Sequence, residues 1–127
     1  MDTYSFTYKI VKKTYTQSTF NFYKNEENIG FIDYYNEYTQ IIISMVYINP
    51  DNDKDDNNVI QYRRKGFGSL MIKFFIDYVK KSFDMVNKIA LMPSKFDGVS
   101  KNWLCYFYEK NGFTQERNGF PFYIKKL

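Results

Sequence analysis

Two glycines separated by one residue, Gly66 and Gly68, stand directly before a stretch with helical periodicity. Its apolar residues recur at helical spacing, at Leu70, Met71, Phe74, Phe75, Tyr78 and Val79. Glycines let the backbone curl so that successive N–H groups point at one spot, and the helix that follows adds unpaired amides and its positive dipole end. The segment therefore predicts an anion site, and the basic run of Arg63, Arg64 and Lys65 before it favours a phosphate.

Comparison with the common glycine-rich motifs narrows which kind of phosphate-binding turn this segment can be. A dinucleotide-binding G-x-G-x-x-G needs a third glycine where this chain has Met71, and no Walker sequence is present. The segment from Arg63 to Gly68 instead fits R-x-x-G-x-G. This pattern resembles the pyrophosphate-binding turn of the GNAT superfamily, the acyl-CoA-dependent N-acyltransferases.

Two further segments extend the resemblance. The run Tyr-Glu-Lys-Asn-Gly-Phe at 108–113 is similar to the Tyr-Glu-Lys-x-Gly-Phe that ends the last helix of that family. Ile48-Asn49-Pro50 is similar to the Val-x-Pro that closes the strand against which the family lays the pantetheine arm of coenzyme A. The resemblance thus covers the chain from about Ile29 to its end, and it implies an N-acetyltransferase that uses acetyl-CoA.

Carried over residue by residue, the resemblance implies contacts to coenzyme A from three places. The pyrophosphate would be held at the glycine turn, by Arg63, Arg64, Lys65, Gly66, Phe67, Gly68 and Ser69. The pantetheine would lie along a strand edge at Met45, Val46 and Ile48, with Asn102 as a further contact one residue out of the usual register. Tyr108 would be the catalytic acid that gives a proton to the departing thiolate, although a core aromatic is an open alternative.

The expected fold is α+β, a three-layer α/β/α domain spanning 1–127. It has a mixed, mostly antiparallel sheet with a central splayed strand pair and two main helices. Strands are predicted near 4–10, 19–24, 29–35, 41–48, 88–92, 113–116 and 120–125, and helices near 68–82 and 100–110. The almost uninterrupted apolar run Ile41–Ile48 predicts a central strand covered on both faces.

The chain departs from the family pattern in two places. Only about six residues, Lys13–Ser18, join the first two strands, where the family places two helices that wall the acceptor site. We therefore expect an unusually open acceptor side. The acidic stretch Asp51–Asn58 is an insertion before the glycine turn, either a solvated loop or an acidic rim that would favour a cationic acceptor.

Composition excludes several classes of chemistry. The chain has one cysteine, Cys105, and no histidine, so an internal disulfide, zinc sites and catalysis by a Ser-His or Cys-His pair are excluded, and no metal is expected. No signal-peptide pattern or apolar run of about 20 residues is present, so a soluble, cytoplasmic protein with no membrane partner is expected. The net charge is +4, but only Arg63–Lys65 forms a tight basic cluster, so nucleic acid is not favoured as a partner.

The general base has no signal in the sequence. Ile41–Ile48 contains no acid, and Asp33, Glu37 and Asp97 are candidates by position alone. The acceptor would be an amine on a small molecule or a protein, and a homodimer is left open. The alternative hypothesis is a GNAT-like module without chemistry that binds acyl-CoA or single-stranded nucleic acid.

Overall fold

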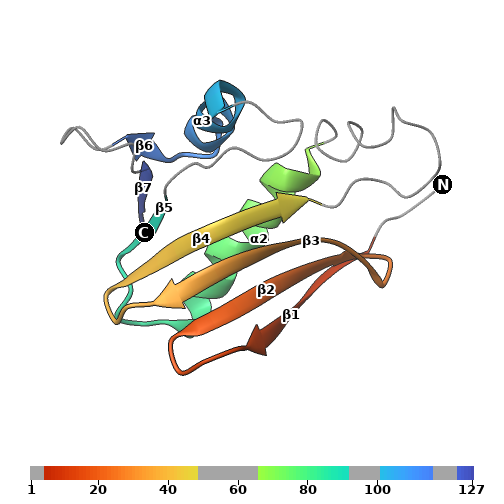
Figure 1. Ribbon diagram of the computed structural model, residues 1–127, viewed down its shortest axis with the longest axis horizontal. Coiled ribbons are helices and arrows are strands. Elements are labelled where there is room, and N and C mark those ends of the chain that lie inside the picture. Colours follow the sequence, from red (N-terminus) through yellow and green to blue (C-terminus); the bar gives the residue numbers. More distant parts are fainter. Residues whose placement is uncertain (1–4, 49–65, 92–100, 116–122) are drawn as a thin grey trace.

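The computed structural model describes residues 5–48, 66–91, 101–115 and 123–127, with the side chains of 101–104 left out. In this part of the chain, seven strands form one sheet and two helices pack against it (Figure 1). The elements are β1 (Phe6–Lys12), β2 (Gln17–Lys24), β3 (Glu27–Asn36), β4 (Gln40–Ile48), α2 (Phe67–Ser82), β5 (Lys88–Leu91), α3 (Lys101–Lys110), β6 (Thr114–Gln115) and β7 (Tyr123–Lys126). Each predicted strand and helix is present among the described residues, close to its expected bounds, whereas residues 120–122 of the last predicted strand lie outside them.

The sheet is mixed and mostly antiparallel, as predicted. Its strand order is β1-β2-β3-β4-β5-β7-β6, and only β4 and β5 run parallel. Strands β1 to β4 are joined by short connections. Asn25 and Glu26 at the β2–β3 turn both have positive φ, which suits the twist of a tight hairpin. Lys13 and Thr14 donate backbone hydrogen bonds to Gln17 at the β1–β2 turn, so the expected lack of helices there is confirmed.

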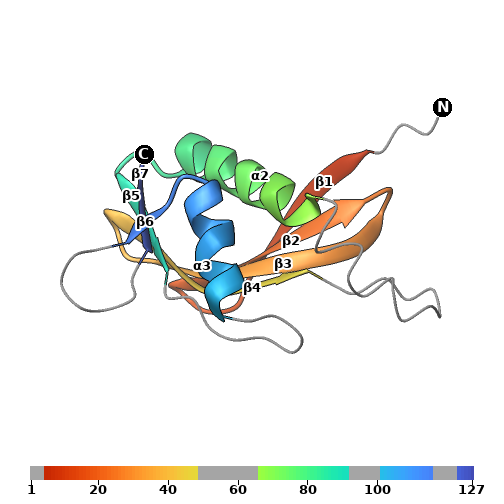
Figure 2. The same ribbon diagram turned by 90° about the horizontal axis from the view of Figure 1, so that it is seen from above.

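Helix α2 covers one face of β1–β4, and Figure 2 shows it running along that side of the strands. Aromatic rings fill the layer between them: Phe20 and Tyr34 each meet the Phe75 ring at 5.2 Å between centroids. The prediction that both faces of β4 are covered is wrong, because burial alternates along it and Met45 is 41% exposed. The described residues place no helix over this second face, which we call the open face.

Strand β1 is the edge of the sheet and is less buried than its alternating pattern predicted. Phe6 packs partly against the core and stacks on Phe22 at 5.5 Å, but Tyr8 remains 39% exposed even though it stacks on Phe20. An edge strand has a neighbouring strand on one side alone, so fewer residues bury it. None of the helices in the described residues is long and apolar enough to span a membrane.

Gly30 on β3 sets how closely the helix approaches the sheet. A Cβ atom built there would lie 2.5 Å from the carbonyl oxygen of Tyr47 and 3.2 Å from the sulfur of Met71 on α2. The first contact is with backbone, which cannot move aside without displacing β4. Gly30 is therefore required by the packing of β3, β4 and α2.

We expect Gly30→Ala to lower the free energy of unfolding by about 1–3 kcal/mol, because the added methyl group overpacks the layer. Urea denaturation followed by circular dichroism measures the change. Ser82→Ala at the exposed end of α2 is the control and should change stability by no more than about 0.5 kcal/mol. Equal stability of Gly30→Ala and the parent would contradict this account of the packing.

Candidate active site

The glycine turn forms the N terminus of α2. Gly66 occupies the N-cap position in the left-handed conformation, with φ 81°, and its carbonyl accepts a hydrogen bond from Leu70 at 3.0 Å. No side chain caps this end, and the first turn contains no acidic residue. Apart from the adjoining residues of the chain, no described atom lies within 4 Å of a Cβ built on Gly66. The turn therefore leaves open space beside the positive end of the helix dipole.

The two glycines of the motif have different roles. A Cβ on Gly68 would lie 3.1 Å from Cζ of Phe107 on α3 and 3.7 Å from Cγ1 of Ile48 at the end of β4. Gly68 thus makes room for the Phe107 ring, whereas Gly66 allows the left-handed backbone conformation at the start of the helix. The same contacts bring the ends of all three sequence motifs together, since Ile48, Gly68 and Phe107 meet at one point.

The side chains at the start of α2 are engaged with the protein. Asn111 donates to the Ser69 hydroxyl at 3.1 Å and to the Phe107 carbonyl at 2.8 Å, which ties α3 to α2. The Phe67 ring packs against Phe6, with 5.9 Å between centroids. What Phe67 can offer an anion is therefore its backbone, whereas Ser69 also retains a hydroxyl proton to donate. Arg63, Arg64 and Lys65 lie outside the described residues.

Strand β4 parts from β5 midway along its length. The parallel pairing ends at Ile43 and Leu91, and from Ser44 to Ile48 the described residues place β3 alone beside β4. Alternate residues of this half therefore direct backbone N–H and C=O groups away from β3. Val46 and Ile48 bury their side chains toward α2, so only their main chain can contact a ligand. The splayed strand pair predicted from the sequence corresponds to this separation.

A β-bulge marks the point where the strands separate. Asp33 pairs with Met45 while Tyr34 pairs with Ile43, which leaves Ser44 as an extra residue on β4. The Ser44 hydroxyl donates to the Asp33 carbonyl at 3.2 Å. Bulges bend a strand and redirect its side chains, so this one turns β4 away from β5. Sequence reasoning missed it, because a bulge at serine has no local signature.

Tyr108 lies in an aromatic cluster between α3 and β7. It is 3% exposed, and its ring contacts those of Phe107, Phe113 and Tyr123. Burial, with a smaller electrostatic contribution from nearby Cys105, raises the pKa of the Tyr108 phenol above its ordinary value. The hydroxyl is therefore protonated at neutral pH and has a proton available to donate. This environment is compatible with both roles considered from the sequence, a catalytic acid and a core aromatic.

Of the remaining predicted residues, some have described side chains and others lie outside the described part of the structure. Asn102 lies on α3, but its side chain is outside the described part of the structure. Cys105 is a free, half-buried thiol one turn from Tyr108, as expected of a small packed side chain. The acidic stretch 51–58 and Asp97 also lie outside the described residues. Within the described ranges, no group of three or more Cys, Asp or Glu side chains is placed to hold a metal ion.

A separate surface hollow of about 420 Å³ lies between α2, α3 and β7. Ile72 and Ile76 contribute to its lining, and Lys73, Lys110 and Lys125 are further lining residues. It begins more than a turn beyond the start of α2, so it is not the open space at Gly66.

No protein-family model and no curated protein sequence matches this chain. Solved structures do match its fold. An acetyltransferase from Thermus thermophilus aligns with a TM-score of 0.63 at 16% identity, over 89% of this chain and 66% of that one. The PaiA N-acetyltransferase from Thermoplasma acidophilum, in complex with coenzyme A, aligns with a TM-score of 0.62 at 18% identity, over 88% and 62%. This chain thus spans just under two thirds of the length of both proteins.

A third structure matches over more of its own length. A GNAT family acetyltransferase from Elizabethkingia anophelis, with acetyl-CoA bound, aligns with a TM-score of 0.63 at 17% identity, over 88% of this chain and 77% of that one. All three alignments cover 88% or 89% of this chain. At these identities the likeness concerns the fold, and the chain has the GNAT fold that its sequence motifs predicted.

Proposed function

We propose that this chain is an N-acetyltransferase that transfers the acetyl group of acetyl-CoA to a primary amine by direct attack. The observation that carries the proposal is the separation of β4 from β5 after Ile43, beside a helix N terminus that Gly66 leaves uncapped. The free strand edge Ser44–Ile48 then begins where β4 leaves β5, and it ends near the candidate anion site at the start of α2. Structures of this fold with coenzyme A or acetyl-CoA bound support the reading.

The described residues fit such a ligand. The open space beside Gly66, at the positive end of α2, suits a pyrophosphate bound by backbone amides. The free side of Met45–Ile48 suits an extended amide-containing arm, which would add to the edge as a further strand does. Acetyl-CoA would supply a thioester, whose acyl carbon is open to attack by a neutral amine.

Tyr108 is our candidate for the group that assists the leaving sulfur. Its raised pKa keeps the hydroxyl protonated, and a phenol that is less acidic than a thiol stabilises a developing thiolate chiefly as a hydrogen-bond donor. The aromatic cluster around it excludes water, which strengthens such a bond. Tyr108 would therefore act by donating a hydrogen bond to the sulfur as the carbon–sulfur bond breaks.

The second candidate is a binding module that has kept the fold without the chemistry. The open face favours it, because Phe31 and Tyr47 stack there at 5.4 Å and Lys9 lies over the Tyr23 ring at 5.3 Å. Such a face could stack the bases of single-stranded nucleic acid. Free thiol released from acetyl-CoA with a panel of amines supports the enzyme, whereas oligonucleotide binding that weakens with salt supports the module.

We expect acetyl-CoA to raise the melting temperature. A ligand bound only by the folded state at a hundredfold excess over Kd adds about 2.7 kcal/mol, or roughly 10 °C for a domain of this size. Differential scanning fluorimetry measures the shift. No shift at millimolar acetyl-CoA would remove the basis for the cofactor site.

Gly66→Val should abolish this shift, because its side chain would enter the open space beside the helix end. Gly112→Val is the matched control, since Gly112 also has a positive φ, of 91°, and a Cβ there would meet the mobile end of Lys125. Both variants should melt earlier because of backbone strain, but only Gly66→Val should fail to respond to acetyl-CoA. A normal response of Gly66→Val would place the phosphates elsewhere.

Tyr108→Phe should lower kcat by about 10²-fold and leave the acetyl-CoA-induced shift in place. Tyr34→Phe removes an equally buried hydroxyl, one hydrogen-bonded to Tyr78 at 3.0 Å, from the layer under α2. That control should lose about 1 kcal/mol of stability and keep its turnover. Unchanged turnover in Tyr108→Phe, with a loss of stability like that of the control, would return Tyr108 to a purely structural role.

A further inference from the structure

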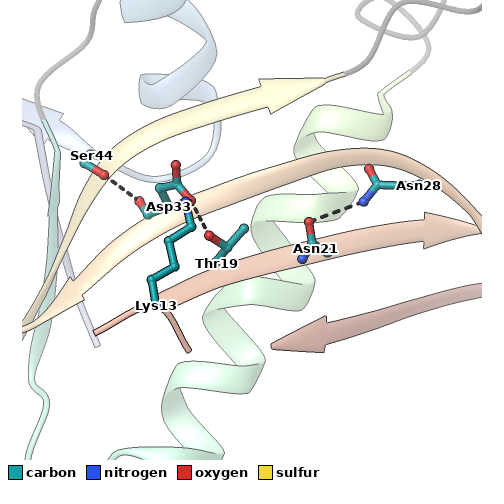
Figure 3. A network of polar contacts seen from close by, with 6 residues as sticks. All are labelled: Lys13, Thr19, Asn21, Asn28, Asp33 and Ser44. Carbon is teal, nitrogen blue, oxygen red and sulfur yellow. Dashed lines mark hydrogen bonds and ion pairs between the residues drawn. The ribbon is translucent and has the colours of Figure 1, made fainter. Parts of the chain in front are cut away.

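Asp33 projects from β3 onto the open face at the level where β4 leaves β5 (Figure 3). It pairs with Met45, immediately beyond the bulge at Ser44. Neighbouring strands lie about 4.8 Å apart, so the carboxylate is roughly one strand width from the free edge of β4. In β2, β3 and β4 the only other acid is Glu27, which pairs with Lys24 beside the far hairpin.

The surroundings of Asp33 hold one oxygen and leave the other available. Oδ1 accepts a hydrogen bond from the Thr19 hydroxyl at 2.5 Å and lies 3.5 Å from Nζ of Lys13. Oδ2 has no hydrogen bond or ion pair with any described residue, and Figure 3 shows it directed away from Thr19. The side chain is 15% exposed, so a small group can reach it. The carboxylate is thus fixed in orientation and still has acceptor capacity.

Lys13 indicates what kind of group this carboxylate accepts. Its side chain is a primary alkylammonium, and at 3.5 Å it meets Asp33 through a long and exposed contact, with 47% of the side chain in solvent. Exposed ion pairs of this kind contribute little to stability, so another ammonium can replace Lys13 at low cost. The open face carries no described helix that would bar its approach.

We propose that Asp33 forms the acceptor site, where its carboxylate binds the primary ammonium of the acceptor and takes one proton from it. This inference rests on the proposed function and selects Asp33 among the three candidates for the base that the sequence left open. The nitrogen, now neutral, forms its bond to the acyl carbon as the carbon–sulfur bond breaks. It loses a second proton as the amide forms, the departing sulfur gains one, and the proton on Asp33 passes to solvent. One proton is therefore released for each amide made.

The binding step is tested without acetyl-CoA, by titrating n-butylamine into ¹⁵N-labelled protein at pH 7 and following backbone amide shifts. We expect the amides of Thr19, Asp33, Ser44 and Met45 to respond, and the uncharged analogue n-butanol to leave them unchanged. Asp33→Asn keeps the acceptor for Thr19 but loses the charge, so its Kd should rise about tenfold or more. Lys13→Gln removes the competing ammonium and should lower Kd. Asp84→Asn, the same change at an exposed site after α2, should leave it within about twofold.

Equal Kd values for Asp33→Asn and the parent, or no response of the open face to n-butylamine, would overturn the proposal. Where Asp33→Asn does not give a folded spectrum, the parent decides, since equal responses of these amides to n-butylamine and to n-butanol contradict the site. Amine binding without thiol release would retain the site and remove the proposed function. Thiol release with equal kinetics in the parent and in Asp33→Asn would retain the proposed function and remove Asp33 from the site.

The proton-transfer step has its own measurement. Asp33→Asn should lower kcat/KM for n-butylamine about 10²-fold, because that amine is an ammonium at pH 7. The loss should be much smaller for 2,2,2-trifluoroethylamine, which is less basic and largely neutral at that pH. A purely structural Asp33 would reduce both rates alike. Asp84→Asn should leave both unchanged.

Discussion

The separation of β4 from β5 is the constraint on which the rest of the site depends. A parallel pair that stayed joined along its whole length would satisfy its own backbone groups and leave nothing for a ligand. Here the pairing stops at Ile43 and Leu91, and the extra residue Ser44 bends β4 at that position. The second half of β4 keeps β3 as its neighbour, so its free edge is held rigidly rather than frayed.

Packing at the far end of β4 keeps this edge in place. Ile48, Gly68 and Phe107 meet where the strand ends, the first helix begins and the last helix passes. Asn111 strengthens the junction through its hydrogen bonds to Ser69 and to the Phe107 carbonyl. Glycine at position 68 is therefore needed for helix packing, which in turn fixes the direction of the helix dipole at Gly66. The same residue serves the core and, through it, the anion site.

The elements and the glycine turn of the candidate site could be predicted from the sequence, because helical periodicity and glycine turns are local signals. The helix from Phe67 to Ser82 and the glycine at its start follow from such signals. The features that shape the site are not local. The bulge at Ser44 depends on register with β3, and the exposure of Met45 depends on the absence of a covering helix among the described residues. The role of Gly68 required knowing where Phe107 of another helix would lie.

The open face also changes what the protein requires of a catalytic base. β4, the strand proposed to hold the pantetheine, carries no acid. With no described helix over β3, a carboxylate on the neighbouring strand remains accessible to an acceptor that approaches across the sheet. Thr19 then has the task that a covering helix would otherwise share, because it fixes the orientation of Asp33 from the adjacent strand β2. The short β1–β2 connection also places Lys13 beside the same carboxylate, so it forms part of the surroundings of the proposed acceptor site.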